Sequence, residues 1–192
     1  MNHIWDYDSW KNISLDRVRQ ALLNRSLSSP KLGDITVREL CCLAKEPWNP
    51  VGIYVFSYSD DILYAGKTHG RSFQERMLSH IDHREPVAGS PHLAQLIQSM
   101  IKRGAASCAD EAVEKVLDMK ITWLPVPQLC LNKSAHKHQI AMTERRLLWH
   151  KCLNPRYNSP RVKKNDSFML AGSRYQLTSG MLLGSPSPCK QM

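Results

Sequence analysis

The sequence lacks the features that mark membrane, secreted and repetitive proteins. No apolar run approaches the roughly 18 residues that a membrane-spanning helix requires. The N-terminal residues Met-Asn-His-Ile-Trp-Asp have neither the charged region nor the apolar region of a secretory signal. No internal repeat is present, which argues against a solenoid. We therefore expect a cytoplasmic protein with no membrane partner, in which 192 residues form one domain with an extension, or at most two small domains.

The cysteines lack the spacing of a metal or redox motif, because no C-x-x-C pair occurs. In a cytosolic protein we expect them to be reduced thiols, most of them buried. A zinc site assembled from dispersed cysteine and histidine residues stays open as an alternative. The six cysteines are Cys41, Cys42, Cys108, Cys130, Cys152 and Cys189.

Acidic residues are the minority among the charged side chains. There are 17 Asp and Glu against 26 Lys and Arg, which gives a formal charge of +9. Such an excess raises the affinity for polyanions and speeds their encounter, but it says nothing about the fold. The charge makes a phosphate-bearing partner plausible and goes no further.

The chain divides by composition into three parts. Its central part opens with residues 51–57 and 62–65, two strands rich in Val, Ile, Tyr and Phe that are joined by a tight turn at Ser59 to Asp61. Thr36 and Glu39 form the capping-box pattern T-x-x-E and predict a helix start. The three parts are a helical N-terminal extension (1–48), a central domain (49–160) and a loosely packed or partly disordered tail (161–192).

The central part continues with helices and one more strand. The order ββααβα predicts an α+β fold, in which a small three-stranded sheet with antiparallel pairing is flanked by helices. A further helix over residues 110–117 is left undecided. The other predicted elements are a helix over 14–23, a helix over 72–83, a helix from Ser90-Pro91 to Gly104, a strand over 119–126 and a helix over 138–153.

The hairpin places two tyrosines close to a lysine. Tyr54 lies on its first strand, and Tyr64 and Lys67 lie on its second. Aromatic residues on strands are usually core or cross-strand pairing residues. Alternatively, a phenol that faces a cleft beside a lysine has its ionised form favoured and can accept a proton from water.

The helix after the hairpin carries a basic edge. Arg76 and His80 are four residues apart and therefore adjacent on one face, and His83 continues that edge. A solvated basic face is the ordinary interpretation. The functional interpretation is a phosphate clamp, in which the guanidinium binds the phosphate and histidine donates a hydrogen bond or shuttles a proton.

Glu144 is a carboxylate on an apolar stripe, which it shares with Ile140, Leu147 and Leu148. A carboxylate in that setting must be paired, protonated or bound to a cation, because burying it bare is costly. Pairing with an arginine is one interpretation. The other is a hard divalent cation, since Mg²⁺ is often held by one or two carboxylates together with water and phosphate oxygens.

Taken together and in this order, these groups resemble the GIY-YIG nuclease superfamily. Gly52-Ile53-Tyr54 matches the first motif of the family, and Tyr64-Ala65-Gly66 matches the second with Ala in place of Ile. The resemblance covers residues 51–159 and includes Arg76, His80, Glu144 and Asn158 in the family's order. The segment between His80 and Glu144 is longer than in compact members, which leaves Glu111 and Glu114 as competing carboxylates.

The resemblance implies a Mg²⁺-dependent or Mn²⁺-dependent endonuclease with one ion in each active site. It implies Tyr54 as general base with Lys67 lowering its pKa, and Glu144 as the metal ligand. The other residues implied at the site are Tyr64 near the nucleophile, Arg76 on the transition-state charge, His80 on the scissile phosphate, and Gly66, His83 and Asn158 in contact with substrate.

The expected partner is DNA, with RNA as an alternative, and the expected assembly is a monomer or a homodimer. A restriction or defence enzyme is the role we favour, and a repair or mobile-element nuclease is an alternative. A restriction enzyme is expected to dimerise in order to cut both strands of a palindrome. An inactive nucleic-acid-binding module on the same scaffold shares the charge but does not require the carboxylate of Glu144.

Overall fold

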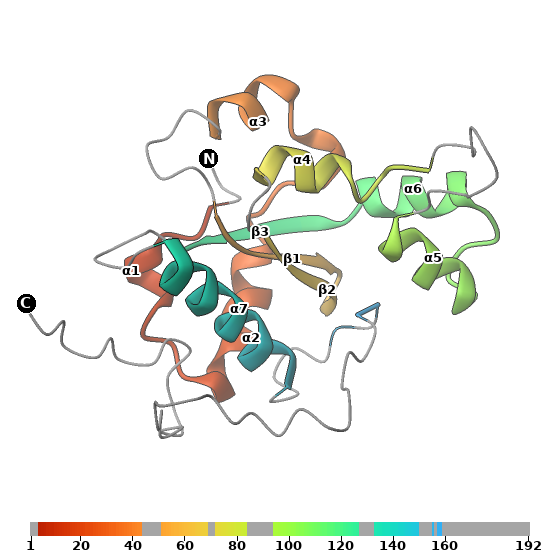
Figure 1. Cartoon of the computed structure of the whole chain (residues 1–192). Coiled ribbons are helices and arrows are strands. Elements are labelled where there is room, and N and C mark those ends of the chain that lie inside the picture. The colour runs from red at the N-terminus through yellow and green to blue at the C-terminus, as the bar shows by residue number, and fades with distance from the viewer. Residues whose placement is uncertain are drawn as a thin grey trace, which may run out of the picture.

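The computed structural model describes residues 4–43, 51–68, 72–83, 94–126, 133–149, 155, 157 and 158. Its centre is a three-stranded antiparallel sheet with strand order β2-β1-β3 (Figure 1). The strands are β1 (Gly52–Tyr58), β2 (Asp61–Thr68) and β3 (Lys120–Pro125). The predicted mixed fold with a three-stranded sheet flanked by helices is confirmed. β2 is an edge strand, and this position matters for the site.

The predicted hairpin is confirmed: β1 is shifted by one residue from the predicted range 51–57, and β2 is longer than the predicted range 62–65. Ser59, in the turn between them, has a φ of 53°, the left-handed conformation common in tight turns. The register shifts next to Phe56, where Leu63 is the extra residue of β2. As a result Leu63 and Tyr64 both pack on the same side of the sheet, as residues at a β-bulge do.

Alternation along the strands sends side chains to two separate cores. Tyr54 and Phe56 of β1 belong to one core, and Ile53 and Val55 belong to the other. The first core is covered by α3 (Val37–Leu43), α4 (Phe73–Leu78), α5 (Gln95–Lys102) and α6 (Ala109–Leu117). The second is covered by α1 (Tyr7–Trp10), α2 (Leu15–Ser26) and α7 (Lys133–Trp149), so that helices lie against both faces of the sheet (Figure 1).

The N-terminal residues pack directly on this sheet. Trp10 and Leu22 are buried in the second core, where they meet residues of all three strands. Isolated bridges also pair Ile4 with Trp123 and Lys31 with Lys120 of β3. A short 3-10 helix, η1 (Leu32–Asp34), leads from α2 to α3. Residues 4–43 thus contribute to the core of the fold.

Two capping boxes begin helices beside the hairpin. The predicted one is confirmed: Thr36 Oγ1 accepts from the Glu39 amide at 3.2 Å, and Glu39 Oε2 accepts from the Thr36 amide at 2.8 Å. A second box joins Ser72 and Glu75 at the start of α4. Each box satisfies backbone donors that a helix start leaves unpaired. The second determines where the helix that carries Arg76 begins.

The predicted helix over 72–83 is wrong in its length, because α4 ends at Leu78. Ser79 Oγ donates to the Arg76 carbonyl at 2.7 Å, and the His80 amide bonds to the Met77 carbonyl three residues back. Such side-chain bonds compete with the helical pattern. The turn that follows brings His80 into the core, where it is 3% exposed.

Other boundaries also differ from the predictions. The undecided helix is present as α6, so the order is ββαααβα, and α7 begins at Lys133 rather than at residue 138. Gly104, with a φ of 69°, follows α5 as the expected stop. The predicted start at Ser90-Pro91 and the tail over 161–192 lie outside the described residues. Cys108 is a free thiol and is exposed, whereas the side chains of the other five cysteines lie outside the described residues. No helix in the described ranges is long and apolar enough to cross a membrane.

Candidate functional site

Tyr54 lies at the centre of the sheet, and its ring covers Gly66. The two residues are direct partners across β1 and β2. A Cβ atom built on Gly66 would lie 2.3 Å from the Tyr54 hydroxyl oxygen and 2.4 Å from Cζ. Only glycine therefore lets the phenol lie flat across β2. Gly66, expected to contact substrate, has the clear structural role of making room for Tyr54.

The Tyr54 hydroxyl is held between two side chains of the α4 segment. Arg76 Nε donates to it at 3.1 Å, and His80 Nε2 lies 2.5 Å from it. Since Arg76 can only donate, the phenol oxygen accepts that bond and its O–H is left for another acceptor. A neutral His80 protonated on Nδ1 supplies one. The predicted adjacency of Arg76 and His80 is thus present, with Tyr54 between them.

Burial sets the protonation of this cluster. It raises the pKa of Tyr54 well above the ordinary value of 10.0, although Arg76 acts in the opposite direction. Burial, with a further contribution from the charge of Arg76, lowers the pKa of His80 to about 3. At neutral pH Tyr54 is therefore a protonated phenol beside a neutral imidazole. Tyr54 is 0% exposed, so the half-buried Arg76 forms the outer part of the cluster.

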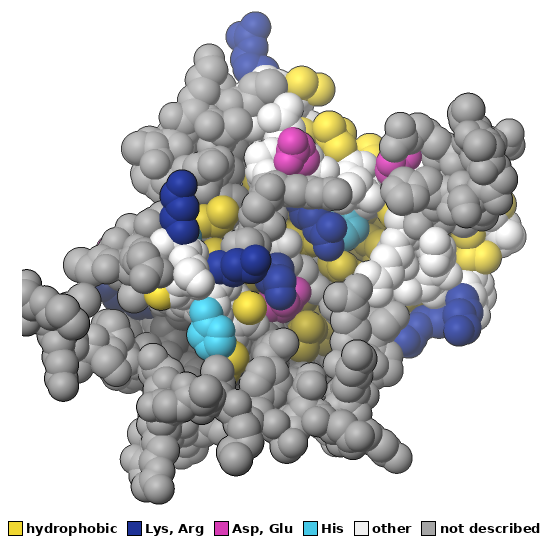
Figure 2. All heavy atoms as spheres, in the orientation of Figure 1, with side chains coloured by type: hydrophobic (Ala, Val, Ile, Leu, Met, Phe, Trp, Pro, Cys, Tyr) yellow, Lys and Arg dark blue, Asp and Glu magenta, His cyan; other side chains and the backbone are white. Residues whose placement is uncertain are grey.

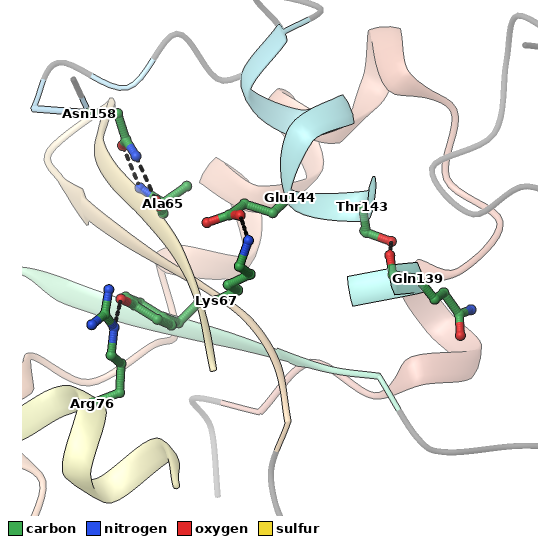
Figure 3. A network of polar contacts seen from close by, with 8 residues as sticks. Ala65, Lys67, Arg76, Gln139, Thr143, Glu144 and Asn158 are labelled. Atoms are coloured by element: carbon green, nitrogen blue, oxygen red, sulfur yellow. Dashed lines mark hydrogen bonds and ion pairs between the residues drawn. The ribbon is translucent and has the colours of Figure 1, made fainter. Parts of the chain in front are cut away.

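Lys67 does not act on Tyr54 as expected. Adjacent residues of a strand face opposite sides, and Lys67 faces α7 whereas Gly66 lies under the Tyr54 ring. Its ammonium binds Glu144 Oε2 at 2.5 Å, and Arg76 is the cation beside Tyr54 (Figure 3). The prediction that Lys67 lowers the pKa of Tyr54 is therefore wrong, because alternation along β2 separates the two side chains.

Glu144 projects from α7 to the edge strand. Ile140, one turn earlier, is buried in the second core and holds this face of α7 against the sheet. The side chain of Glu144 is 18% exposed and that of Lys67 is 35% exposed. Of the two interpretations offered for Glu144, pairing is observed, with lysine in place of arginine. Figure 3 shows the second carboxylate oxygen directed away from Lys67.

Tyr64 connects the two sides of the site. Burial raises its pKa, the charge of Arg76 lowers it, and the charge of Glu144 raises it again. Its ring centroid lies 6.1 Å from that of Tyr54 and 5.0 Å from that of His80. Tyr64 therefore lies within electrostatic reach of both the guanidinium and the carboxylate. The five groups Tyr54, Tyr64, Arg76, His80 and Glu144 surround one short stretch of β2.

Asn158 binds the outer edge of that stretch. Its Oδ1 accepts from the Ala65 amide at 2.8 Å, and its Nδ2 donates to the Ala65 carbonyl at 2.7 Å (Figure 3). The Tyr157 amide also donates to the Leu63 carbonyl at 2.8 Å. Asn158 therefore anchors its own segment to the backbone of β2, which is an edge strand of the described sheet.

Tyr157 is a member of the site region that sequence reasoning missed. It is 4% exposed and packs in the first core with Tyr54 and Tyr64. The position of an aromatic residue directly before Asn158 was the available signal. It went unused because a single tyrosine two residues after Pro155 carries no periodic pattern.

His83 and the competing carboxylates lie elsewhere. His83 Nε2 is 3.3 Å from Asp110 of α6, and its Nδ1 bonds to the Ile81 carbonyl. The expectation that His83 continues the edge of Arg76 is wrong, because α4 has already ended at Leu78. Glu111 bonds to Ser107 and Lys115 within its own segment. Glu114 is also on α6, which packs in the first core, whereas α7 packs in the second.

The donor set fits a cation that completes its shell from solvent and substrate. Among the residues that the structure describes, no three His, Cys, Asp or Glu side chains gather into a metal-binding group. Glu144 instead offers a single, partly exposed carboxylate, a hard oxygen ligand of the kind Mg²⁺ takes one or two of. Lys67 pairs with one of its oxygens, so a metal ion at Glu144 would have to share or displace that contact.

Basic side chains gather at the site on the surface. Figure 2 shows Lys and Arg side chains in a band across the middle of this face, over the region where α7, the sheet and α4 lie in Figure 1. An acidic side chain and a histidine lie within the band. The positive charge seen in the composition is therefore present around the candidate site.

No protein-family model matches this chain, and neither a curated protein nor a solved structure matches it. The likeness to GIY-YIG nucleases rests on the motif residues themselves. Two of them, Tyr54 and Gly66, are cross-strand partners, and the Tyr54 ring lies against Gly66.

Proposed function

We propose that this chain is an endonuclease of the GIY-YIG type that hydrolyses DNA phosphodiester bonds with one Mg²⁺ or Mn²⁺ ion. One observation carries the proposal: the Tyr54 hydroxyl, held between Arg76 and His80, lies beside Tyr64, which responds to the charges of both Arg76 and Glu144. An in-line displacement at phosphorus requires a base, an anion-binding guanidinium and a metal ion around one phosphate, and Tyr54, Arg76 and Glu144 would supply these three roles.

Arg76 binds the scissile phosphate in this proposal. Its guanidinium is half-buried, and a phosphodiester placed against it exchanges water for a charge-assisted hydrogen bond. The same guanidinium then meets the charge that grows on the phosphorane-like transition state. The negative charge of the phosphate also opposes the effect of Arg76 on His80 and so raises the pKa of that imidazole in the complex.

Tyr54 and His80 together move the proton. The attacking water transfers a proton to the Tyr54 oxygen as the phenol proton passes to His80 Nε2, the neighbour at 2.5 Å. The water oxygen forms the new bond to phosphorus, and the bond to the leaving 3′ oxygen breaks. Routing the proton to His80 avoids a free phenolate, which burial of Tyr54 disfavours.

Glu144 holds the metal ion in this proposal. When bound, the ion stabilises negative charge on the leaving 3′ oxygen. Lys67 must then release the carboxylate, and its ammonium, one residue from Gly66, remains available to a phosphate oxygen.

Cleavage of supercoiled plasmid with and without Mg²⁺ tests the proposal. We expect Mg²⁺-dependent nicking by the wild-type protein and a loss of about 10²–10³-fold in rate for Arg76→Ala and Glu144→Gln. Both variants are expected to bind DNA, since the charge elsewhere is unchanged. Undiminished Mg²⁺-dependent cleavage by Glu144→Gln would show that the metal assignment is wrong.

A second candidate function is a nucleic-acid-binding module without activity. Two observations favour it: Glu144 is neutralised by Lys67, and Tyr54 is fully covered. DNA binding by the wild-type protein without nicking under any metal condition would select this alternative. For an active enzyme, sequencing the cut ends separates a restriction or defence role, with a fixed palindromic target, from a repair or mobile-element role.

A further inference from the structure

α7 carries two exposed lysines in line with Glu144. Lys137 lies seven residues before Glu144, a separation that places the two side chains about 20° apart around the helix. Lys133 lies one turn earlier, about 40° from Lys137. His136, Ile140 and Thr143 form the buried face of the helix. Lys133, Lys137 and Glu144 therefore share one flank of α7, the flank from which Glu144 reaches β2.

The two lysines are exposed on the surface of α7. Within the part of the chain that the structure describes, no ion pair joins either of them to an acidic side chain. Glu144 is the only acidic residue in the sequence of α7, and Lys67 is its partner. Other lysines of the described ranges are held in ion pairs, for example Lys11 with Asp8, Lys31 with Asp118, Lys67 with Glu144 and Lys115 with Glu111.

We propose that Lys133 and Lys137 bind backbone phosphates of duplex DNA on one side of the scissile phosphate. This inference rests on the proposed function, because Glu144 marks where the scissile phosphate lies. At 1.5 Å per residue, Lys137 is about 10 Å and Lys133 about 16 Å from Glu144 along the helix axis. Each DNA strand carries one phosphate per about 3.4 Å of its axis, so these positions reach phosphates about three and five steps away.

The band of basic side chains in Figure 2 fits this placement, because it extends from the sheet over the helix labelled α7 in Figure 1. Phosphate contacts of this kind set the register of a duplex on the protein and carry no sequence information. Lys133 and Lys137 thus orient the DNA while the cluster around Tyr54 performs the chemistry. They are positioning residues and do not touch the reacting atoms.

The salt dependence of DNA binding tests the proposal. Affinity of the full chain for a fluorescent DNA duplex is measured by anisotropy over a series of NaCl concentrations, with Ca²⁺ in place of Mg²⁺. Each phosphate contact contributes about 0.9 to the slope of log affinity against log salt. We expect Lys133→Gln/Lys137→Gln to lower that slope by about 2 and to weaken binding at every salt concentration. Lys133→Arg/Lys137→Arg retains the charge and is expected to keep the wild-type slope.

Lys102→Gln/Arg103→Gln is the charge-matched control. Both residues are exposed at the end of α5, which packs in the first core, whereas α7 packs in the second. The proposal is overturned if Lys133→Gln/Lys137→Gln has the same slope of log affinity against log salt as the wild type or as this control. That holds even where cleavage is intact. Failure of the wild-type protein to bind duplex DNA overturns the proposed function as well.

A cleavage readout separates positioning from chemistry. At saturating protein, the single-turnover rate constant of Lys133→Gln/Lys137→Gln is expected to stay within about twofold of wild type, because only binding has been weakened. A large loss of that rate constant with unchanged affinity would contradict the inference and place the lysines in the catalytic machinery. Circular dichroism confirms that the variants are folded.

Discussion

The ammonium of Lys67 lies 2.5 Å from Oε2 of Glu144, across 77 residues of sequence, and so joins the edge strand β2 to helix α7. The carboxylate is mostly buried, whereas the lysine is about one-third exposed. A cation already occupies the position at which the proposed function requires a divalent ion. Lysine and metal must therefore compete for the same oxygen.

Lys67→Met removes that competitor and is expected to tighten Mn²⁺ binding by about threefold to tenfold, a modest gain because solvent screens the pair. Electron paramagnetic resonance of free Mn²⁺ measures the affinity directly and needs no cleavage activity. Glu144→Gln serves as the control that abolishes binding. Weaker Mn²⁺ binding by Lys67→Met would instead show that the lysine orients Glu144 for the metal.

Gly66→Ala is expected to destabilise the fold by about 1–3 kcal/mol, because its Cβ would lie 2.3 Å from the Tyr54 hydroxyl and displace the ring. Urea unfolding measures the change. In a Tyr54→Ala background the ring is absent, so the same glycine substitution should cost much less. Equal costs in both backgrounds would mean that the penalty arises in the strand rather than at the ring.

Asn158→Ala removes both hydrogen bonds to Ala65 and leaves two backbone groups of the edge strand without them. We expect a loss of about 1–2 kcal/mol in the free energy of unfolding and faster hydrogen exchange at the Ala65 amide. Asn158→Asp keeps an acceptor for the Ala65 amide but loses the donor to the Ala65 carbonyl. The exchange rate of the Ala65 amide in this variant should therefore fall between that of the wild type and that of Asn158→Ala. Unchanged exchange in Asn158→Ala would contradict the clamp.

His80 makes stability depend on pH in the acid range. Its pKa is about 3 in the folded protein against 6.5 ordinarily, so between these values the unfolded chain binds more protons. Stability is therefore complete above about pH 6.5 and falls with decreasing pH, by at most about 1.4 kcal/mol per unit. Carboxylates titrate lower, which makes pH 5–6.5 the informative window.

Urea unfolding at several pH values measures this slope. His80→Gln should flatten it, while His138→Gln, at an exposed position on α7, should leave it as in the wild type. A wild-type slope that His80→Gln does not change would mean that His80 is solvated and protonated normally in the folded protein.

Local patterns predicted much of the fold. The hairpin, the capping box at Thr36 and the stop at Gly104 depend on residues within a few positions of one another, so the sequence alone reveals them. The length of α4 did not follow from periodicity. The Ser79 hydroxyl and the burial of His80 ended that helix early, and both effects involve the three-dimensional surroundings.

The sequence by itself determined which chemical groups are present and in what order, together with the alternation that sends Tyr54 and its neighbours to opposite faces of the sheet. Only the tertiary structure decided the partner of each charge: Arg76 for Tyr54, and Glu144 for Lys67. The physical reason is that strand geometry is a local property, whereas a contact between α7 and β2 depends on how apolar residues such as Ile140 pack the helix onto the sheet.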